Sequence, residues 1–286
     1  MQDSQYYREN NNLWFDDSSA FTLENLKEKV VSATKECGLF LWRSGKCLTK
    51  ENLLELSNTL GTALNQSAQG CEVFEVKDEG YEKTDPRFRG PSSNRQLTFH
   101  TDRCDLLLFH CIRQASEGGV NLFVHSETIY SILEEESPEL LKVLEENFLY
   151  KRHNADPANP LSYYELPVFG DKKERVITLM TWLIEQAHQD SELPNLSELQ
   201  LKSLVKIQEI CQRKEVHLEV SLKPGDLLFL NNLQMLHSRT AFEASGDRLY
   251  YRVWLAVPWS VELPDSFEEL FGATAAGAVR GGFKKF

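Results

Sequence analysis

The stretch "LTFHTDRCDLLLFHCI" (residues 97–112) places a histidine and an aspartate two positions apart in an apolar, β-like run. Alternate side chains of a strand share one face, so His100 and Asp102 are expected to point the same way. A carboxylate on a buried face is unfavourable unless it is paired or bound to a metal. The pair therefore predicts either part of a metal site or two polar residues that share a face by chance. Residues elsewhere in the chain distinguish these two interpretations.

The downstream run "GDLLFLNNLQMLHSRTAF" (residues 225–242) supplies His237, which we expect just after a strand, at the start of a turn. Two histidines and one carboxylate on one side of an iron leave three positions open, as in the facial triad of non-haem Fe(II) oxygenases. In "RLYYRVWL", Arg248 and Arg252 are four residues apart and share a strand face. Because guanidinium groups pair with carboxylates, this pattern predicts a cavity for acidic ligands beside the metal.

The motifs "FHTD", "EGGVNLFV", "GDLLFLNNLQMLHSRTAF" and "GDRLYYRVWL" resemble the taurine dioxygenase-like branch of the Fe(II)/2-oxoglutarate-dependent oxygenases. Clavaminate synthase and γ-butyrobetaine hydroxylase are broader relatives with the same layout. The motifs span residues 97–258, and the opening "ENLKEKVVSATKECGLFLWR" also looks like the family's N-terminal region. HxD alone occurs by chance in many proteins. The order of HxD, a distal histidine and an arginine eleven residues later is the specific part of the resemblance.

The resemblance implies three iron ligands: His100, Asp102 and His237. It also implies that Arg248 holds the distal carboxylate of 2-oxoglutarate. Asn121 stands where the family usually has a small polar residue, often threonine, that touches this co-substrate, so an asparagine there is a departure. Arg252 aligns with a second arginine that in some relatives contacts an acidic group of the substrate or the co-substrate.

The function that the resemblance implies is an Fe(II)- and 2-oxoglutarate-dependent dioxygenase. With O2, such an enzyme oxidises, most often hydroxylates, an unactivated C–H bond of a small anionic or amino-acid-like molecule and releases succinate and CO2. Desaturation, cyclisation or epimerisation with the same cofactors stays open, as does a non-catalytic metal-binding jelly-roll. Arg248 argues against the last alternative, because a pure metal binder needs no carboxylate clamp. Asp102 argues against halogenation, since related halogenases have glycine or alanine in this position.

Weaker candidates for contact with the substrate rest on sequence position alone. Asn94 and Gln96 stand in a long polar stretch just before His100. Arg280 stands in the glycine-rich tail "GAVRGG", which could fold back over a cavity.

The alternation of short β-like runs and helical stretches predicts a mainly β fold with flanking helices. A double-stranded β-helix (jelly-roll) core fits the strand pattern and the resemblance, with an N-terminal α/β region and a helical insert at about residues 176–213. We expect a single domain over residues 1–286, divided as follows: a polar, loosely held segment (1–20), a candidate lid loop (62–96), the jelly-roll core (97–258) and a C-terminal tail (259–286).

Composition limits the classes of partner. The net charge of -12 argues against binding to nucleic acid or to an anionic membrane surface. The six cysteines are scattered without a CxxC pair, which favours a reducing compartment, and no apolar stretch approaches the roughly 20 residues that span a bilayer. We therefore expect a cytoplasmic protein that acts on a small molecule, with homo-oligomer formation left open.

Overall fold

Two sheets form the centre of the computed structural model, which describes residues 3–17, 22–67, 69–80, 92–152, 161–170, 174–243 and 248–283. The larger sheet has the strand order β1-β2-β10-β5-β12-β3, with β4 also paired to β12. Its strands are β1 (Phe15–Asp16), β2 (Leu39–Arg43), β3 (Thr62–Leu64), β4 (Val73–Val76), β5 (Leu106–Arg113), β10 (Asp226–Asn231) and β12 (Leu249–Ala256). The smaller sheet, of order β11-β6-β9, contains β6 (Asn121–His125), β9 (Leu218–Val220) and β11 (Met235–Arg239).

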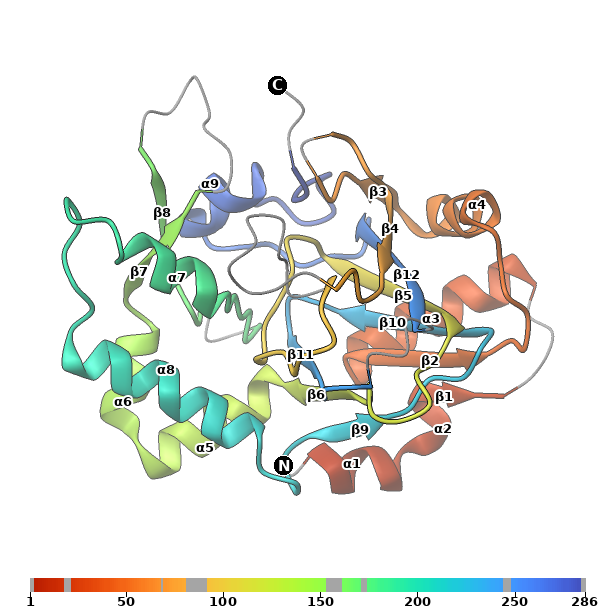
Figure 1. Cartoon of the computed structure of the whole chain (residues 1–286), viewed down its shortest axis with the longest axis horizontal. Coiled ribbons are helices and arrows are strands. Elements are labelled where there is room, and N and C mark those ends of the chain that lie inside the picture. Colours follow the sequence, from red (N-terminus) through yellow and green to blue (C-terminus); the bar gives the residue numbers. More distant parts are fainter. Residues whose placement is uncertain are drawn as a thin grey trace.

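The two sheets pack face to face across a shared apolar core (Figure 1). Leu107, Leu228 and Tyr250 from the larger sheet lie in one buried cluster with Phe123 and Met235 from the smaller sheet. These residues occupy the inward positions of their strands, because side chains alternate between the two faces of a sheet. The jelly-roll predicted from the sequence is thereby confirmed.

Two N-terminal helices cover the outer face of the larger sheet, as Figure 1 shows. They are α3 (Leu23–Glu36) and α4 (Lys50–Leu60), and each begins after a threonine whose side chain accepts a hydrogen bond from the backbone N–H three residues on. Val30 and Leu53 from these helices are fully buried, in one cluster with Phe229 of β10. This capping and apolar spacing are the features that predict these helices from sequence.

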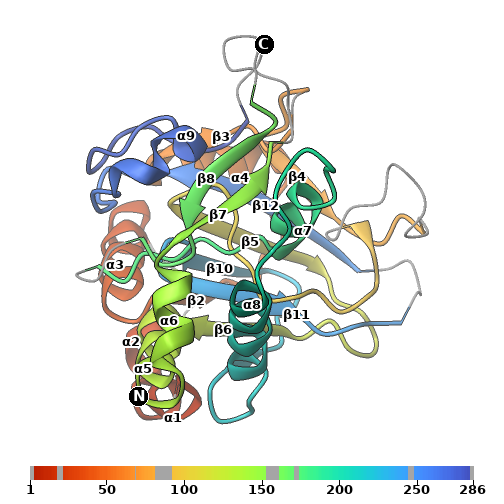
Figure 2. The same ribbon diagram turned by 90° about the vertical axis from the view of Figure 1, so that its left-hand side faces the viewer.

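A second layer of helices covers the smaller sheet and surrounds a two-stranded ribbon (Figure 2). Its elements are α5 (Ser126–Glu136), α6 (Pro138–Leu144), β7 (Asn147–Lys151), β8 (Tyr163–Pro167), α7 (Thr181–Ala187) and α8 (Glu198–Cys211). The helical insert predicted for residues 176–213 corresponds to α7 and α8, and Ser197 begins α8 with a capping box. Across the described ranges, no helix has the length and apolar character that crossing a membrane requires.

The N-terminal segment differs from its prediction. Residues 3–17 form α1 (Asp3–Glu9), α2 (Asn11–Trp14) and β1, so the expectation of a loosely held segment is wrong there. Tyr7 and Trp14 explain the difference: both are buried, their rings meet edge to face, and the Tyr7 hydroxyl donates to the Cys37 carbonyl. Two large aromatic side chains anchor a segment whose overall composition is polar.

Two further expectations change in detail. Residues 97–102, predicted as a strand, make only an isolated bridge between His100 and His237. The candidate lid loop contains β3 and β4, while its residues 68 and 81–91 lie outside the described ranges.

The C-terminal tail folds back onto the core after a 3-10 turn (Asp265–Phe267) and α9 (Glu268–Phe271). Arg280 is buried there, and its Nε donates to Asp105 Oδ1 at 2.7 Å. Its other nitrogens donate to the backbone carbonyls of Val261, Thr274 and Ala275. The arginine therefore attaches the tail to the segment that follows the HxD motif.

We expect Arg280→Met to lower the free energy of unfolding by about 3–5 kcal/mol, because it leaves the buried Asp105 carboxylate without its partner. Urea unfolding measures this difference. The double variant Asp105→Asn with Arg280→Met removes both charges and keeps an acceptor for the Val257 N–H, so it should regain a large part of the loss. A double variant no more stable than Arg280→Met would show that the ion pair is not what holds the tail.

His125 links pH to the stability of α5. Its Nδ1 accepts a hydrogen bond from the Glu127 N–H at 3.1 Å, and burial lowers the pKa of the imidazole to about 4. Protonation removes this acceptor, so the stability that the neutral ring contributes is lost as pH falls from about 6.5, the ordinary pKa of histidine, to about 4.

We expect His125→Asn to remove this pH dependence, because asparagine caps helices without titrating near neutrality. Relative to the variant, the wild type should lose up to about 3 kcal/mol of stability between pH 7 and pH 4, measured by urea unfolding. Asp3, which accepts from the His125 N–H, titrates in both proteins and largely cancels. Parallel stability curves across this pH range would contradict the assignment.

Candidate active site

The structure brings the three predicted metal ligands together. Donor atoms of His100, Asp102 and His237 all lie within 4.8 Å of one another, and all three residues are buried. His237 Nε2 is 3.8 Å from Asp102 Oδ2, and the two imidazole centroids are 4.2 Å apart. His237 lies within strand β11, so its expected place just after a strand is wrong: the turn comes earlier, between β10 and β11.

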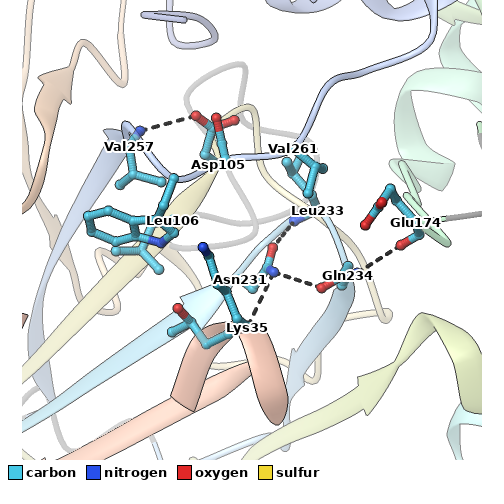
Figure 3. Close-up of a pocket in the computed structure, with 12 residues that line it drawn as sticks. Lys35, Asp105, Leu106, Glu174, Asn231, Leu233, Gln234, Val257 and Val261 are labelled. Atoms are coloured by element: carbon cyan, nitrogen blue, oxygen red, sulfur yellow. Dashed lines mark hydrogen bonds between the residues drawn. The ribbon is translucent and has the colours of Figure 1, made fainter. Parts of the chain in front are cut away.

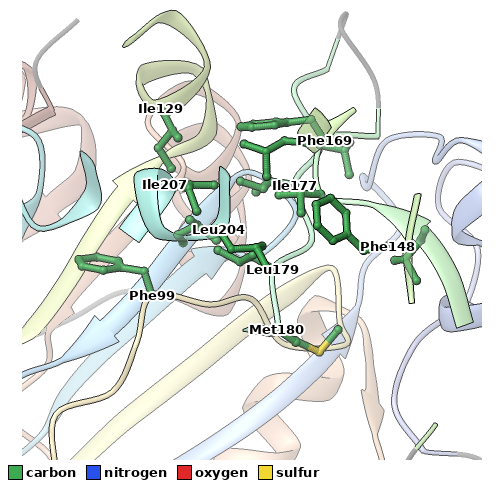
Figure 4. Packing of buried hydrophobic residues seen from close by; sticks show 14 of the residues in the cluster. Phe99, Ile129, Phe148, Phe169, Ile177, Leu179, Met180, Leu204 and Ile207 are labelled. Atoms are coloured by element: carbon green, nitrogen blue, oxygen red, sulfur yellow. The ribbon is translucent and has the colours of Figure 1, made fainter. Parts of the chain in front are cut away.

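Side chains from other elements hold the HxD segment in place of a strand ladder. The Gln208 amide of α8 accepts from the Phe99 N–H at 2.9 Å and donates to the Phe99 carbonyl at 2.8 Å. Asn232, in the turn after β10, accepts from the Asp102 N–H and donates to the Asp102 and Cys104 carbonyls, all at 2.7–2.8 Å. Figure 4 shows Phe99 packed near Leu204 of α8, so the helical insert positions the histidine that follows.

The protonation states suit metal binding. His100 Nδ1 lies 2.8 Å from the Thr98 carbonyl, so this nitrogen carries the proton and Nε2 is free to bind a metal. Burial lowers the pKa of both His100 and His237, which keeps the imidazoles neutral. Burial by itself raises the pKa of Asp102, but the Arg252 charge and the other neighbours outweigh this effect and hold that pKa below its ordinary value. Two neutral imidazoles and one carboxylate are a donor set that fits Fe(II).

A second group of residues orients Asp102. Its Oδ2 accepts from Arg252 Nη1 at 3.1 Å and from Trp254 Nε1 at 3.0 Å. Arg252 Nε in turn donates to Gln66 Oε1 at 2.8 Å, and Gln66 Nε2 donates to the Arg252 carbonyl at 2.8 Å. The sequence did not reveal Gln66 or Trp254 as site residues. Trp254 had a usable signal, since it follows Arg252 by two positions on the same strand face.

Arg248, directly before β12, belongs to a group of buried donors that have no acceptor among the described residues. Arg248 is 3% exposed, and its guanidinium carbon lies 3.8 Å from the Tyr250 ring centroid. Its Nε and Nη1 have no hydrogen-bond partner in the part of the chain that the structure describes. Within the same described ranges, Gln114 Nε2, the Tyr250 hydroxyl and two nitrogens of Arg239 also lack partners. A Cβ on Gly119 would lie 3.1 Å from Arg248 Nε, so the glycine leaves space there. Buried donors need acceptors, and a carboxylate such as that of 2-oxoglutarate fits these residues.

The remaining predicted residues lie in different surroundings. Asn121 is buried on β6, and its Nδ2 lies 3.3 Å from the Val220 carbonyl. Asn94 is half-buried and accepts from the Phe242 N–H through its carbonyl, and Gln96 is exposed. Arg280 uses its donors within the tail and on Asp105, so these contacts give no support to its predicted role at the substrate. The substrate roles of these residues, and that of Arg252, stay predictions.

A separate cavity of about 280 Å³ lies between α3, the β10–β11 turn and the tail (Figure 3). Asn231 and Gln234 line it and hydrogen-bond to each other at 2.8 Å, and Gln234 Nε2 donates to the Glu174 carbonyl. None of the three predicted metal ligands lines this cavity. It is therefore distinct from the site around Asp102.

Comparison with known proteins identifies the family of this chain. Residues 9–254 match the family described as "Taurine catabolism dioxygenase TauD, TfdA family". The chain belongs to this family. In this TauD/TfdA-family chain, His100 and Asp102 of the HxD motif lie together with His237 among the strands described above.

Relatives in sequence are similar over part of their length. FR-33289 synthase of Streptomyces rubellomurinus is 26% identical over 219 residues, which cover 72% of this TauD/TfdA-family chain and 63% of that protein. The taurine hydroxylase-like protein SAT17 of Stachybotrys chartarum is 27% identical over 180 residues, covering 61% of this chain and 45% of that protein. The match thus spans about half to two thirds of these curated relatives.

Solved structures share the fold. Asparagine oxygenase in complex with Fe(II), 2S,3S-3-hydroxyasparagine and succinate aligns with a TM-score of 0.62 at 18% identity, covering 88% of this chain and 84% of that one. The non-heme iron oxygenase OrfP in complex with Fe and alpha-ketoglutaric acid aligns with a TM-score of 0.56 at 18% identity, covering 90% and 86%. At 18% identity, the similarity to these two structures shows that the TauD/TfdA-family chain shares their fold.

Gln66→Leu should weaken Fe(II) binding by about 10- to 100-fold, because Arg252 then loses the contact that holds it on Asp102. Anaerobic titration with Fe(II), or with Mn(II) as a substitute, measures the affinity, and circular dichroism checks the fold. The exposed Gln212 offers a matched control, since Gln212→Leu should leave metal affinity unchanged. Equal affinities in the two variants would mean that Gln66 does not support the metal site.

Proposed function

We propose that this protein is an Fe(II)- and 2-oxoglutarate-dependent dioxygenase that hydroxylates a C–H bond of a small, anionic or amino-acid-like molecule. The observation that carries the proposal is the buried group of His100, Asp102 and His237 in one interior with the unpartnered donors of Arg248. A metal site alone does not require such a clamp. Membership of the TauD/TfdA family supports the same activity.

The three ligands would hold iron on one side and leave its other positions to co-substrate and O2. When bound, iron and 2-oxoglutarate together supply the activation of O2 that oxidises a C–H bond, with succinate and CO2 as the other products. Asp102 contributes one oxygen to Arg252 and Trp254, which orients the carboxylate. His100 keeps its Nδ1 proton on the Thr98 carbonyl, which fixes the direction of Nε2.

Arg248 would bind the distal carboxylate of 2-oxoglutarate. Its buried Nε and Nη1 have no partner among the described residues, so the guanidinium has donors available for a carboxylate. The nearby Tyr250 hydroxyl and Gln114 amide can complete the hydrogen bonds of that group, and the small Gly119 leaves room for it. Asn121 is buried on β6 and remains our candidate for a further contact with 2-oxoglutarate.

We propose the nature of the substrate from the molecules bound in two structural neighbours. One structural neighbour is an asparagine oxygenase crystallised with a hydroxylated asparagine, and another, OrfP, was crystallised with a hydroxylated arginine. We extend an amino-acid-like substrate to this chain on that likeness. Desaturation, cyclisation and epimerisation share the same cofactors, and mass analysis of the product separates them: hydroxylation adds one oxygen atom, whereas desaturation removes two hydrogens.

The remaining expectations are part of the proposal. They are a single domain over residues 1–286, a small-molecule partner without nucleic acid or membrane, a cytoplasmic location and a possible homo-oligomer. The net charge of -12 supports the absence of nucleic acid and anionic membrane among the partners.

Arg248→Met should raise the dissociation constant for 2-oxoglutarate by about 10-fold or more, because a charge-assisted, two-donor contact is lost. Anaerobic addition of 2-oxoglutarate to the Fe(II)-loaded protein measures this through the visible charge-transfer band of the chelate. Fe(II) affinity should be unchanged. Arg213→Met is the matched control, since Arg213 pairs with Glu136 away from the site. Absence of the band in the wild type would refute the proposed function, and an unchanged affinity in Arg248→Met would refute the clamp alone.

A further inference from the structure

A tryptophan of the helical insert contacts one of the predicted metal ligands. Trp182 is the second residue of α7, and its ring centroid lies 5.3 Å from that of His100 at an interplanar angle of 75°. The His237 imidazole is 4.2 Å from His100 as well, so the indole ring lies next to the pair of histidines that would bind the metal. The insert therefore reaches the metal site through an aromatic side chain.

Hydrogen bonds fix the start of α7 relative to the HxD motif. Thr101, which stands between the two ligands of the motif, donates from its N–H to the Leu179 carbonyl at 3.0 Å. The Leu179 N–H donates in return to Thr101 Oγ1 at 3.0 Å, and both residues are buried. Figure 4 shows Leu179 near Phe99, the residue that precedes His100. Since α7 begins two residues after Leu179, these contacts hold Trp182 beside the metal ligand.

Trp182 is less covered than the other aromatic residues beside the metal ligands. Phe109 of β5 has its ring centroid 6.0 Å from that of His237, and Trp254 donates to Asp102. These two residues are 8% and 5% exposed, whereas Trp182 is half-buried. A substrate has to approach the metal from a side that the protein does not close. The uncovered part of the Trp182 ring marks such a side.

We propose that Trp182 determines substrate specificity: its indole ring forms the wall of the substrate site beside His100 and packs against the carbon chain of the substrate. This inference rests on the proposed function and deepens it, because it names the part of the substrate that the insert recognises. The C–H bond that is oxidised has to lie close to the metal, and a ring in contact with a metal ligand reaches the same carbon segment. Since Trp182 and Phe109 both present apolar rings there, this segment is an aliphatic chain without charged or hydrogen-bonding groups.

A role confined to supporting His100 explains less of the geometry. Phe109 packs beside His237 from a nearly buried position, and a ring that only supports an imidazole gains from being covered in the same way. An indole ring that is left partly uncovered forgoes hydrophobic stabilisation, which a bound aliphatic chain restores. The two roles also predict different measurements. Support of His100 changes the affinity for the metal, whereas a substrate wall changes the affinity for the aliphatic chain at saturating metal.

The test measures how affinity depends on the length of an aliphatic chain. The probes are alanine, 2-aminobutyrate, norvaline and norleucine, whose side chains grow by one carbon at a time. Homoserine is added as the polar match of norvaline, with a hydroxyl in place of the terminal methyl group. Each probe is titrated without oxygen into protein saturated with Fe(II) and 2-oxoglutarate. The change in the visible band of the chelate reports that the probe has arrived beside the metal, and thermal shift gives an independent affinity.

The variants separate the indole ring from the rest of α7. Trp182→Phe keeps a smaller ring, while Trp182→Gln and Trp182→Ala remove the ring but remain compatible with a helix. Circular dichroism checks the fold, and a separate titration measures the affinity for Fe(II). The control is Trp259→Ala, since Trp259 is also half-buried but lines the cavity that is distinct from the metal site.

We expect the affinity of the wild type to rise by about 4-fold for each added carbon, because each methylene group that packs on the ring leaves water. Homoserine should bind more weakly than norvaline, since its hydroxyl finds no partner on an indole ring. Trp182→Gln and Trp182→Ala should reduce the increment per carbon to less than about 2-fold. Trp182→Phe should keep part of the increment, and Trp259→Ala should keep all of it.

The full increment in Trp182→Gln or Trp182→Ala overturns the proposed wall, as does a wild type that binds none of the probes. A lower affinity for Fe(II) with an unchanged increment assigns Trp182 to the support of His100 and overturns the wall as well. If neither of these two variants folds, Trp182→Phe decides, because its smaller ring should give a smaller increment than the wild type. A wild type that shows no chelate band with 2-oxoglutarate refutes the proposed function itself.

Discussion

A carboxylate is stable in a protein interior only where opposite charge and hydrogen-bond donors surround it, and Asp102 meets this condition with groups from distant parts of the chain. Arg252 and Trp254 of β12 donate to one of its oxygens, and His237 of β11 lies beside it. The turn after β10 holds its backbone through Asn232. The jelly-roll is the arrangement that brings these strands to one point, so the geometry of the site and the packing of the fold depend on each other.

The two arginines Arg248 and Arg252, on one face at and just before β12, differ in their hydrogen-bond partners. Arg252 donates to Asp102 and Gln66, whereas two nitrogens of Arg248, four residues earlier on the same face, have no partner among the described residues. Of the two, Arg248 is therefore the arginine that we propose to bind the co-substrate. Arg239, which also carries two buried nitrogens without a partner among the described residues, lies over the same Phe242 ring as Arg248.

Local elements followed from sequence where the signal was itself local. Thr49 caps α4 as its position before the helical run indicates, and the apolar runs of β5, β10 and β12 form central strands. The prediction was wrong at residues 3–17, because burial of Tyr7 and Trp14 depends on surfaces supplied by later segments. It was also wrong for residues 97–102, where amide side chains from α8 and from the β10–β11 turn take the place of strand pairing. Contacts of this kind leave no periodic trace in the sequence.

The sequence by itself placed His100 and Asp102 on one face, because alternate side chains of an extended chain point the same way. Its resemblance to the family singled out His237, which the structure brings to the same point, and Arg248 as the proposed co-substrate clamp. Tertiary structure alone decided that Arg252 contacts Asp102, that Gln66 supports it, and that Arg280 attaches the tail to Asp105. The physical reason is distance along the chain: Gln66 and Arg252 are 186 residues apart, and Arg280 and Asp105 are 175 apart. A hydrogen bond between such residues is set by how the sheets and the tail pack, which no local pattern encodes.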